Sequence, residues 1–132
     1  CIVPTIPIAI FTDGSVDLTR IEQGNMPAML AHIVYFTLES QTPEAIQQLV
    51  SACHQFLSGH DGVAYFGVGT RTEDLQRPVN QTDFDVALHI VFETRADHDR
   101  YQTHPRHLEF IDRNKETWAK VRVFDTDLVT AT

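Results

Sequence analysis

The sequence predicts an α+β fold in which two helices cover one face of a four-stranded antiparallel sheet. In four segments, successive side chains alternate between two faces with a period of two residues, which is typical of strands. In these segments either one face is apolar and the other polar, or both faces are apolar. Two other segments repeat apolar residues at spacings of three and four, which is typical of amphipathic helices. These segments follow one another as strand, helix, strand, strand, helix, strand. This is the order of the ferredoxin-like βαββαβ arrangement.

Length and charge limit the classes of function. The chain has 132 residues, enough for one domain with a buried core and too few for two. Acidic residues outnumber basic ones by 18 to 10, and the formal net charge is −8. Because this charge repels phosphate backbones and anionic lipid surfaces, we expect neither a nucleic acid nor a membrane partner. Cys1 and Cys53 form no disulfide framework, and a cytoplasmic protein is expected.

The ends of the chain differ from its middle. The first 29 residues hold three of the six prolines and no regular strand pattern. We predict an N-terminal extension over residues 1–29, either disordered or packed as an arm on a neighbouring chain. The domain is predicted over residues 30–126, and residues 127–132 form a C-terminal tail.

The first strand and the first helix are predicted from alternation and capping. Residues 31–39 form the strand, with His32, Val34 and Phe36 on one side. Thr42 then acts as the N-cap of a helix whose first turn contains Pro43. A stripe of apolar side chains continues this helix to the glycine at position 59.

The same kinds of pattern predict three more strands and a second helix in the rest of the domain. Residues 63–70 form a second strand, residues 71–83 a polar loop and residues 84–93 the clearest strand of the chain. Thr94 and Asp97 resemble a capping box at the start of the second helix. Residues 118–125 form the fourth strand.

One face of the predicted sheet has no helix to cover it. The side chains on that face are largely apolar: Ile33, Tyr35, Ala87, His89 and Val91. An exposed sheet face of this kind predicts a partner. A homodimer that closes two such sheets into a dimeric α/β barrel is the simplest solution.

The segment 101–107 carries the residues best suited to chemistry. It contains Tyr101, His104 and His107 around Pro105. Histidine exchanges protons near neutral pH, and a tyrosine hydroxyl can donate to a carbonyl or enolate oxygen. Because proline disfavours helical geometry in the residue before it, we expect a kink at 104–105 that can turn His107 toward Tyr101.

His32 is the third candidate for a catalytic role. If its strand face meets the helices, His32 points into the same space as Tyr101 and His107. A mostly apolar pocket with a few polar groups is the usual form of a small-molecule site. We expect its lining to include these residues: Val34, Val86, Leu88 and His104.

Less specific explanations apply to the same residues. His104 is explained more simply as the cap of the helix that starts at Pro105, and His32 is either a catalytic residue or a buried histidine bonded to the backbone. A metal site formed by His98, His104 and His107 is disfavoured, because the proline splits the set and no carboxylate has a matching spacing. We therefore expect no metal and no cofactor.

Several segments together form a family pattern. These are 32–36 (His-Ile-Val-Tyr-Phe), 62–69, 83–88 and the element Tyr-x-x-His-Pro-x-His at 101–107. They resemble the stress-responsive dimeric α/β-barrel (Dabb) family, and residues 121–125 resemble its last strand. The resemblance covers about residues 30–126. It implies a ferredoxin-like protomer that pairs into a barrel, with a role in stress responses.

The family includes a plant cyclase that closes a linear polyketide without metal or organic cofactor. By resemblance, His107 matches the general base of that enzyme, Tyr101 its hydroxyl donor and His32 a histidine that lines its pocket. Val86 stands where that enzyme has another pocket histidine, so the same substrate is not implied.

Two functional hypotheses follow. In the first, the protein is a cofactor-free enzyme of cyclase or lyase type that acts on a small apolar carbonyl compound. In the second, it is a non-catalytic dimer that binds an apolar ligand or supports stress tolerance through its own stability. A monooxygenase-like activity has only the fold in its favour.

Overall fold

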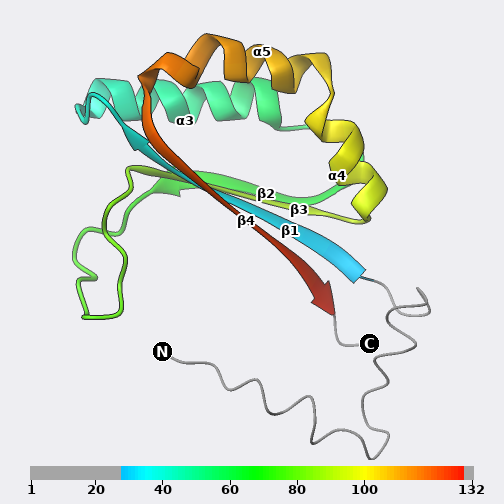
Figure 1. Cartoon of the computed structure of the whole chain (residues 1–132), viewed down its shortest axis with the longest axis horizontal. Helices are drawn as coiled ribbons and strands as arrows, with labels where there is room; N and C mark the ends of the chain where they lie inside the picture. Colours follow the sequence, from blue (N-terminus) through cyan, green and yellow to red (C-terminus); the bar gives the residue numbers. More distant parts are fainter. Residues whose placement is uncertain (1–27, 130–132) are drawn as a thin grey trace, which may run out of the picture.

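The structure, a computed structural model, describes residues 28–129 of the chain. Its elements follow the predicted order, except that the second helix is divided in two (Figure 1). The predicted N-terminal extension lies outside the described residues, apart from Ala28 and Met29, which begin the first strand. Of the predicted C-terminal tail, residues 127–129 are described and belong to the last strand.

Four strands form one sheet, and every neighbouring pair is antiparallel. The strands are β1 (Ala28–Leu38), β2 (Val63–Thr70), β3 (Val86–Phe92) and β4 (Trp118–Val129). Their order across the sheet is β2-β3-β1-β4, so β1 and β3 are central and β2 and β4 are edges. This topology confirms the predicted ferredoxin-like α+β fold.

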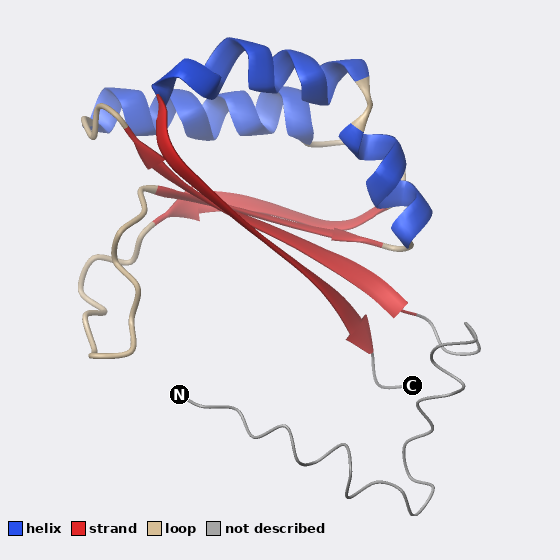
Figure 2. Cartoon of the chain, viewed as in Figure 1, coloured by secondary structure: helices blue, strands red, loops and turns tan. Residues whose placement is uncertain are grey.

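The helices lie on one side of this sheet (Figure 2). They are α3 (Pro43–Leu57), α4 (Arg95–Gln102) and α5 (Pro105–Asn114), followed by a short 3-10 helix, η2 (Lys115–Thr117). Helices α3 and α5 run side by side over the sheet, and α4 covers the end where β1 begins (Figure 1). The helix layer therefore leaves the opposite face of the sheet bare.

The predicted caps form and fix where the helices begin. The hydroxyl of Thr42 accepts a hydrogen bond from the backbone N–H of Ala45 at 3.2 Å. The hydroxyl of Thr94 accepts one from the backbone N–H of Asp97 at 3.1 Å. Caps of this kind stabilise a helix by about 1 kcal/mol each. They place α4 directly after β3, over the end of the sheet.

Gly62 allows α4 to approach the turn before β2. Its φ is +82°, a conformation that favours glycine. A Cβ atom at this position would lie 2.1 Å from Cγ of Asp97, so any side chain here would collide with the start of α4. The glycine thus helps to hold α4 against the sheet.

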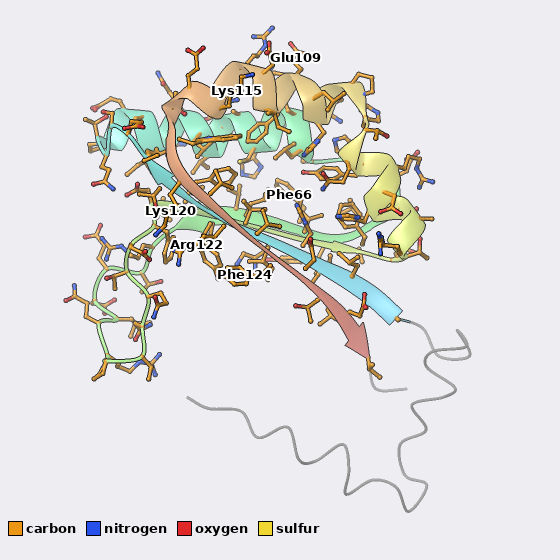
Figure 3. The ribbon with its side chains drawn as sticks, in the orientation of Figure 1. Phe66, Glu109, Lys115, Lys120, Arg122 and Phe124 are labelled. Atoms are coloured by element: carbon orange, nitrogen blue, oxygen red, sulfur yellow. The ribbon has the colours of Figure 1, made fainter. Side chains whose placement is uncertain are left out.

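The core lies between the sheet and the helices. Alternate residues of β3 point into it, and their side chains are at most 2% exposed: Val86, Leu88, Ile90 and Phe92. Burial of each such side chain contributes roughly 1.5–3 kcal/mol. Leu49, Cys53 and Leu57 of α3 and Phe110 of α5 pack against them. Figure 3 shows Phe66 of β2 on this inner side as well.

The bare face is as apolar as the sequence predicted. Ile33 and Tyr35 of β1 point to it, and the register places Phe124 of β4 beside Ile33. Phe124 is 51% exposed. Figure 3 shows Phe124 and Arg122 on the side of the sheet away from the helices. A large, half-exposed aromatic residue on an uncovered face is consistent with a partner surface.

The edge strand β4 is longer than predicted. It continues to Val129 instead of ending at residue 125, because its end pairs with the start of β1, Ala28 opposite Val129. β3 is shorter, starting at Val86, because the two preceding residues belong to the loop. β4 matters for function, since it places Asp125 opposite His32 of β1.

Candidate active site

Strand β1 places His32 on the helix-covered face of the sheet. It alternates with Val34 and Phe36, and only 5% of His32 is exposed. Asp125 lies directly opposite in β4, with its Oδ1 2.6 Å from Nδ1 of His32. An ionised carboxylate only accepts, so Nδ1 of His32 is the donor. Burial lowers the pKa of His32, while Asp125 acts in the opposite direction.

The break between α4 and α5 brings the other two candidates together. His104 is the N-cap of α5, and its Nδ1 accepts a hydrogen bond from the backbone N–H of Arg106 at 3.1 Å. The capping role predicted for His104 is therefore confirmed. Beyond this break the ring of His107 returns toward Tyr101, and the two ring centroids are 4.5 Å apart. The convergence predicted from the proline is confirmed.

One hydrogen bond sets the tautomer of His107. Its Nδ1 lies 3.1 Å from the backbone carbonyl oxygen of Gln102. A carbonyl oxygen only accepts, so Nδ1 carries the ring proton. Nε2 of the neutral ring therefore keeps its lone pair. This is the nitrogen that can accept a proton from a bound molecule.

Burial keeps His107 in this basic form. Its side chain is largely buried, and desolvation lowers its pKa below the ordinary value of 6.5. The hydrogen bond to the Gln102 carbonyl raises the pKa, but by less. Nearby imidazoles lower it further: His32, His60 and His98. At neutral pH the ring is therefore uncharged, as a general base must be.

Tyr101 is a donor held in an apolar setting. It is 2% exposed, and its ring packs against Phe92 with centroids 5.1 Å apart and against His60 at 5.0 Å. Burial raises the pKa of its hydroxyl, so the phenol keeps its proton. No hydrogen bond to another described residue contributes to this shift. The hydroxyl is thus available to a ligand.

His32, Tyr101 and His107 line one cavity between the sheet and the helices. Its volume is about 170 Å³. The rest of the lining is mostly apolar and includes Val34, Leu57, Leu88 and Phe110. Val121 and Val123 of the edge strand also line it and are 39% and 50% exposed, so the cavity reaches the surface beside β4.

Two residues expected in the lining lie elsewhere. Val86 is fully buried in the core opposite Phe36 and does not line the cavity. His104 faces a second, smaller hollow of about 140 Å³, where its ring packs against His60 with centroids 4.7 Å apart. Its capping bond holds it there, because Nδ1 must face the start of α5.

A larger hollow of about 520 Å³ lies on the bare face of the sheet. It is bordered by Phe124 of β4 and by the loop between β2 and β3, which hangs away from the helices in Figure 2. Arg71 and Arg122 are the charged residues of its lining, which contains no histidine or carboxylate. It lacks a group that can act as a base near neutral pH. The cavity of about 170 Å³ lined by His32, Tyr101 and His107 is therefore the better candidate site.

Sequence reasoning missed three residues that shape the site. Asp125 bonds His32, the carbonyl of Gln102 orients His107, and His98 packs against His32 with ring centroids 5.3 Å apart. Parity along β4 could have placed Asp125 on the inner face, since it alternates with two valines there. His32, His98 and Asp125 are also the residues within 28–129 whose donor atoms are grouped closely enough for a metal ion.

Residues 30–128 match the family described as the stress responsive A/B barrel domain, Dabb. The chain belongs to the Dabb family. The match covers all the described helices and the sheet, apart from the first two residues of β1 and the last residue of β4. No curated protein matches the sequence.

Solved structures support the same fold. A Dabb family protein from Mesorhizobium loti has a TM-score of 0.62 at 24% identity, with 80% of this chain and 99% of that chain covered. Hydroxynitrile lyase from Passiflora edulis has a TM-score of 0.64 at 22% identity, covering 80% of this chain and 98% of that one.

A dimeric ferredoxin-like protein of unknown function from Thermobifida fusca gives a TM-score of 0.64 at 16% identity, covering 77% of this chain and 92% of that one. At these identities the comparisons establish the fold and not the reaction. The protein from Thermobifida fusca is described as dimeric. In the described part of the Dabb protein, no helix combines the length and the apolar character needed to cross a membrane.

Proposed function

We propose that this Dabb protein is a cofactor-free enzyme that removes a proton beside the carbonyl group of a small apolar compound. One observation carries the proposal: His107, with an unprotonated Nε2, and Tyr101, with a protonated hydroxyl, line the same cavity. A base and a hydrogen-bond donor that converge on one apolar space are the minimal set for enolate chemistry.

The reaction follows from these two groups. The Tyr101 hydroxyl donates a hydrogen bond to the carbonyl oxygen of the substrate. Nε2 of His107 takes a proton from the adjacent carbon, and the electron pair of that C–H bond forms the enolate. The hydrogen bond from Tyr101 strengthens as negative charge develops on the oxygen. Protonated His107 then returns a proton to the product, which restores the enzyme.

The size of the cavity limits the substrate. A dry, apolar cavity of about 150 Å³ is known to hold benzene, which has six heavy atoms. The cavity here is about 170 Å³. It accommodates a compound of roughly six to eight heavy atoms, such as a cyclic ketone or a short aldehyde. A longer substrate would have to extend past Val121 and Val123 at the mouth.

Some structural neighbours are named as enzymes. Hydroxynitrile lyase from Passiflora edulis shares the fold at 22% identity. Its name supports the idea that this fold carries lyase chemistry. The substrate of that enzyme is not assigned to this chain, because the proposal depends on the cavity residues described above.

Proton exchange tests the proposal without knowledge of the natural substrate. Cyclohexanone has seven heavy atoms, and its α-protons are replaced by deuterium when an enolate forms in D₂O. We expect the protein to accelerate this exchange, and His107→Ala to lower the accelerated rate at least about 100-fold, the usual contribution of a general base. His54→Ala is the matched control, since His54 is an exposed histidine of α3 outside the cavity.

The same experiment separates the two functional hypotheses. Cyclohexanone that binds without any exchange would contradict the enzymatic proposal and favour a non-catalytic ligand-binding dimer. A rate unaffected by His107→Ala would remove His107 from the reaction. A stress-related role and a cytoplasmic location stay predictions from the sequence.

We also propose that the Dabb protomer pairs with a second copy through its bare sheet face. Phe124 and Tyr65 are exposed on that face, 51% and 60% respectively. Arg71 and Arg122 border the hollow there, and Nε of each is buried without a partner among the described residues. A second sheet would cover the apolar residues and supply acceptors to these arginines.

A further inference from the structure

Three metal-ligating side chains meet at one end of the helix layer. They come from three elements: His32 from β1, His98 from α4 and Asp125 from β4. One donor atom from each lies within 4.8 Å of the other two. The three residues are far apart in the sequence, so only the folded chain brings them together. None of them is needed to cap a helix or to fill the centre of the core.

Each of the three side chains offers an atom that can act as a metal ligand. Nδ1 of His98 lies 3.0 Å from Oδ1 of Asp99, which only accepts, so this nitrogen carries the proton. Nε2 of His98 therefore keeps its lone pair, and the Gln102 amide lies 3.4 Å from it. Nδ1 of His32 and Oδ1 of Asp125 face each other at 2.6 Å, sharing one proton that a cation can replace.

Charge and burial around the group favour a cation. His32 is 5% exposed, and the side chain of His98 is 13% exposed, so water competes weakly for both rings. Asp125 and Asp99 bring two carboxylates. Arg95 is the nearby positive charge, but its guanidinium is bonded to Asp99 at 2.9 Å and is 75% exposed.

We propose that His32, His98 and Asp125 bind one first-row divalent transition metal ion, with Zn²⁺ as the best-fitting example. Two imidazoles and one carboxylate suit zinc, whereas Mg²⁺ and Ca²⁺ prefer oxygen ligands. At the short end of the Zn–N and Zn–O range, about 2.0 Å, tetrahedral ligands lie about 3.3 Å apart. The bonded pair must therefore open by about 0.7 Å and His98 must move inward, which side-chain rotation allows.

The second shell of this site already exists. Metal-bound histidines commonly donate their other ring N–H to a carboxylate. Asp99 accepts that bond from His98. Three protein ligands leave a fourth position open to water.

The site adjoins the cavity and shares one residue with it. The ring of His32 lines the cavity, whereas His98 and Asp125 do not. A metal ion bound at Nδ1 would hold this ring in place and leave the proton on Nε2. This set differs from His98, His104 and His107, which the sequence pattern disfavoured as a metal site: His104 packs against His60, and His107 against Tyr101. His98 instead joins two residues from other elements.

Calorimetric titration of ZnCl₂ into the metal-free full-length protein tests the proposal. We expect one Zn²⁺ per chain with a Kd in the micromolar range or below. His98→Ala and Asp125→Asn should each weaken binding at least tenfold, whereas the control His54→Ala should change it less than twofold. Asp125→Asn keeps an acceptor for His32 and so separates metal binding from the hydrogen bond. No binding at 1 mM Zn²⁺, or equal binding by all variants, would overturn the site.

A second measurement uses the unmodified protein and does not depend on the folding of variants. Added Zn²⁺ should shift the NMR signals of the His32 and His98 rings before those of any other histidine, and MgCl₂ should not. Signals that move first at other histidines would assign the metal elsewhere and refute the proposal. His107→Ala should leave Zn²⁺ binding unchanged within twofold, so that failure of the enzymatic proposal and failure of this one can be distinguished.

Discussion

Replacing Tyr101 by phenylalanine separates a catalytic from a structural role for its hydroxyl. The ring is 2% exposed and packs against His107 and Phe92, and the substitution keeps all of these contacts. Only the hydroxyl is lost, and no bond from it to another described residue contributes to its pKa. The change therefore removes a polar group from an apolar site and breaks no hydrogen bond within the described chain.

Tyr101→Phe should affect stability and activity differently. A buried polar group without a partner destabilises a protein by about 1–3 kcal/mol, and contact with the cavity reduces this effect. We expect Tyr101→Phe to leave the free energy of unfolding unchanged or to raise it by up to about 1 kcal/mol. The accelerated exchange of cyclohexanone should fall about 100-fold, the usual effect of removing one donor to a developing oxyanion.

Urea unfolding followed by circular dichroism gives the first quantity, and deuterium incorporation measured by NMR gives the second. Tyr65→Phe is the matched control, because Tyr65 is 60% exposed on the bare face of the sheet. It should leave the rate of exchange unchanged. A loss of more than about 1 kcal/mol with full activity would show that the Tyr101 hydroxyl is structural, and the reasoning would be refuted.

Two further predictions concern proton binding and assembly. Because burial lowers the pKa of His107 below 6.5, its ring should titrate with a midpoint below 6.5 by NMR, and exchange activity should rise with pH and level off by about that value. The unfolded chain binds more protons than the folded one below pH 6.5, so stability should fall as the pH drops from 6.5 through the folded pKa. A midpoint at or above 6.5 would contradict this assignment. Phe124→Glu places a charge on the bare face, and we expect it to convert a dimer to a monomer in sedimentation experiments, whereas Leu108→Glu on the exposed side of α5 should not. A wild-type protein that is monomeric at high concentration would disprove the proposed interface.

Local sequence rules predicted the fold well. The second strand begins at residue 63 and ends at residue 70, as predicted, and Thr42 and Thr94 cap the helices as expected. Pro105 predicted the helix break and the meeting of Tyr101 with His107. These features depend on neighbours in the chain, where steric and capping preferences decide the outcome.

The rest of the site depends on pairing between distant segments. The contact between His32 and Asp125 requires the register of β1 against β4, which spans 93 residues of sequence. The approach of His98 to His32 requires the position of α4 over the end of the sheet. Neither can be obtained from local patterns. Val86 illustrates the same limit, since its strand face was predicted correctly but its absence from the cavity lining was not.

Chemical rescue of His107→Ala tests the central claim most directly. This variant removes the imidazole from the cavity wall and leaves space beside Tyr101 for a small base. We predict that its exchange of cyclohexanone α-protons is at least about 100-fold slower than that of the wild-type protein and that added imidazole restores part of the rate. Exchange at the wild-type rate without imidazole would contradict the assignment of His107 as the base.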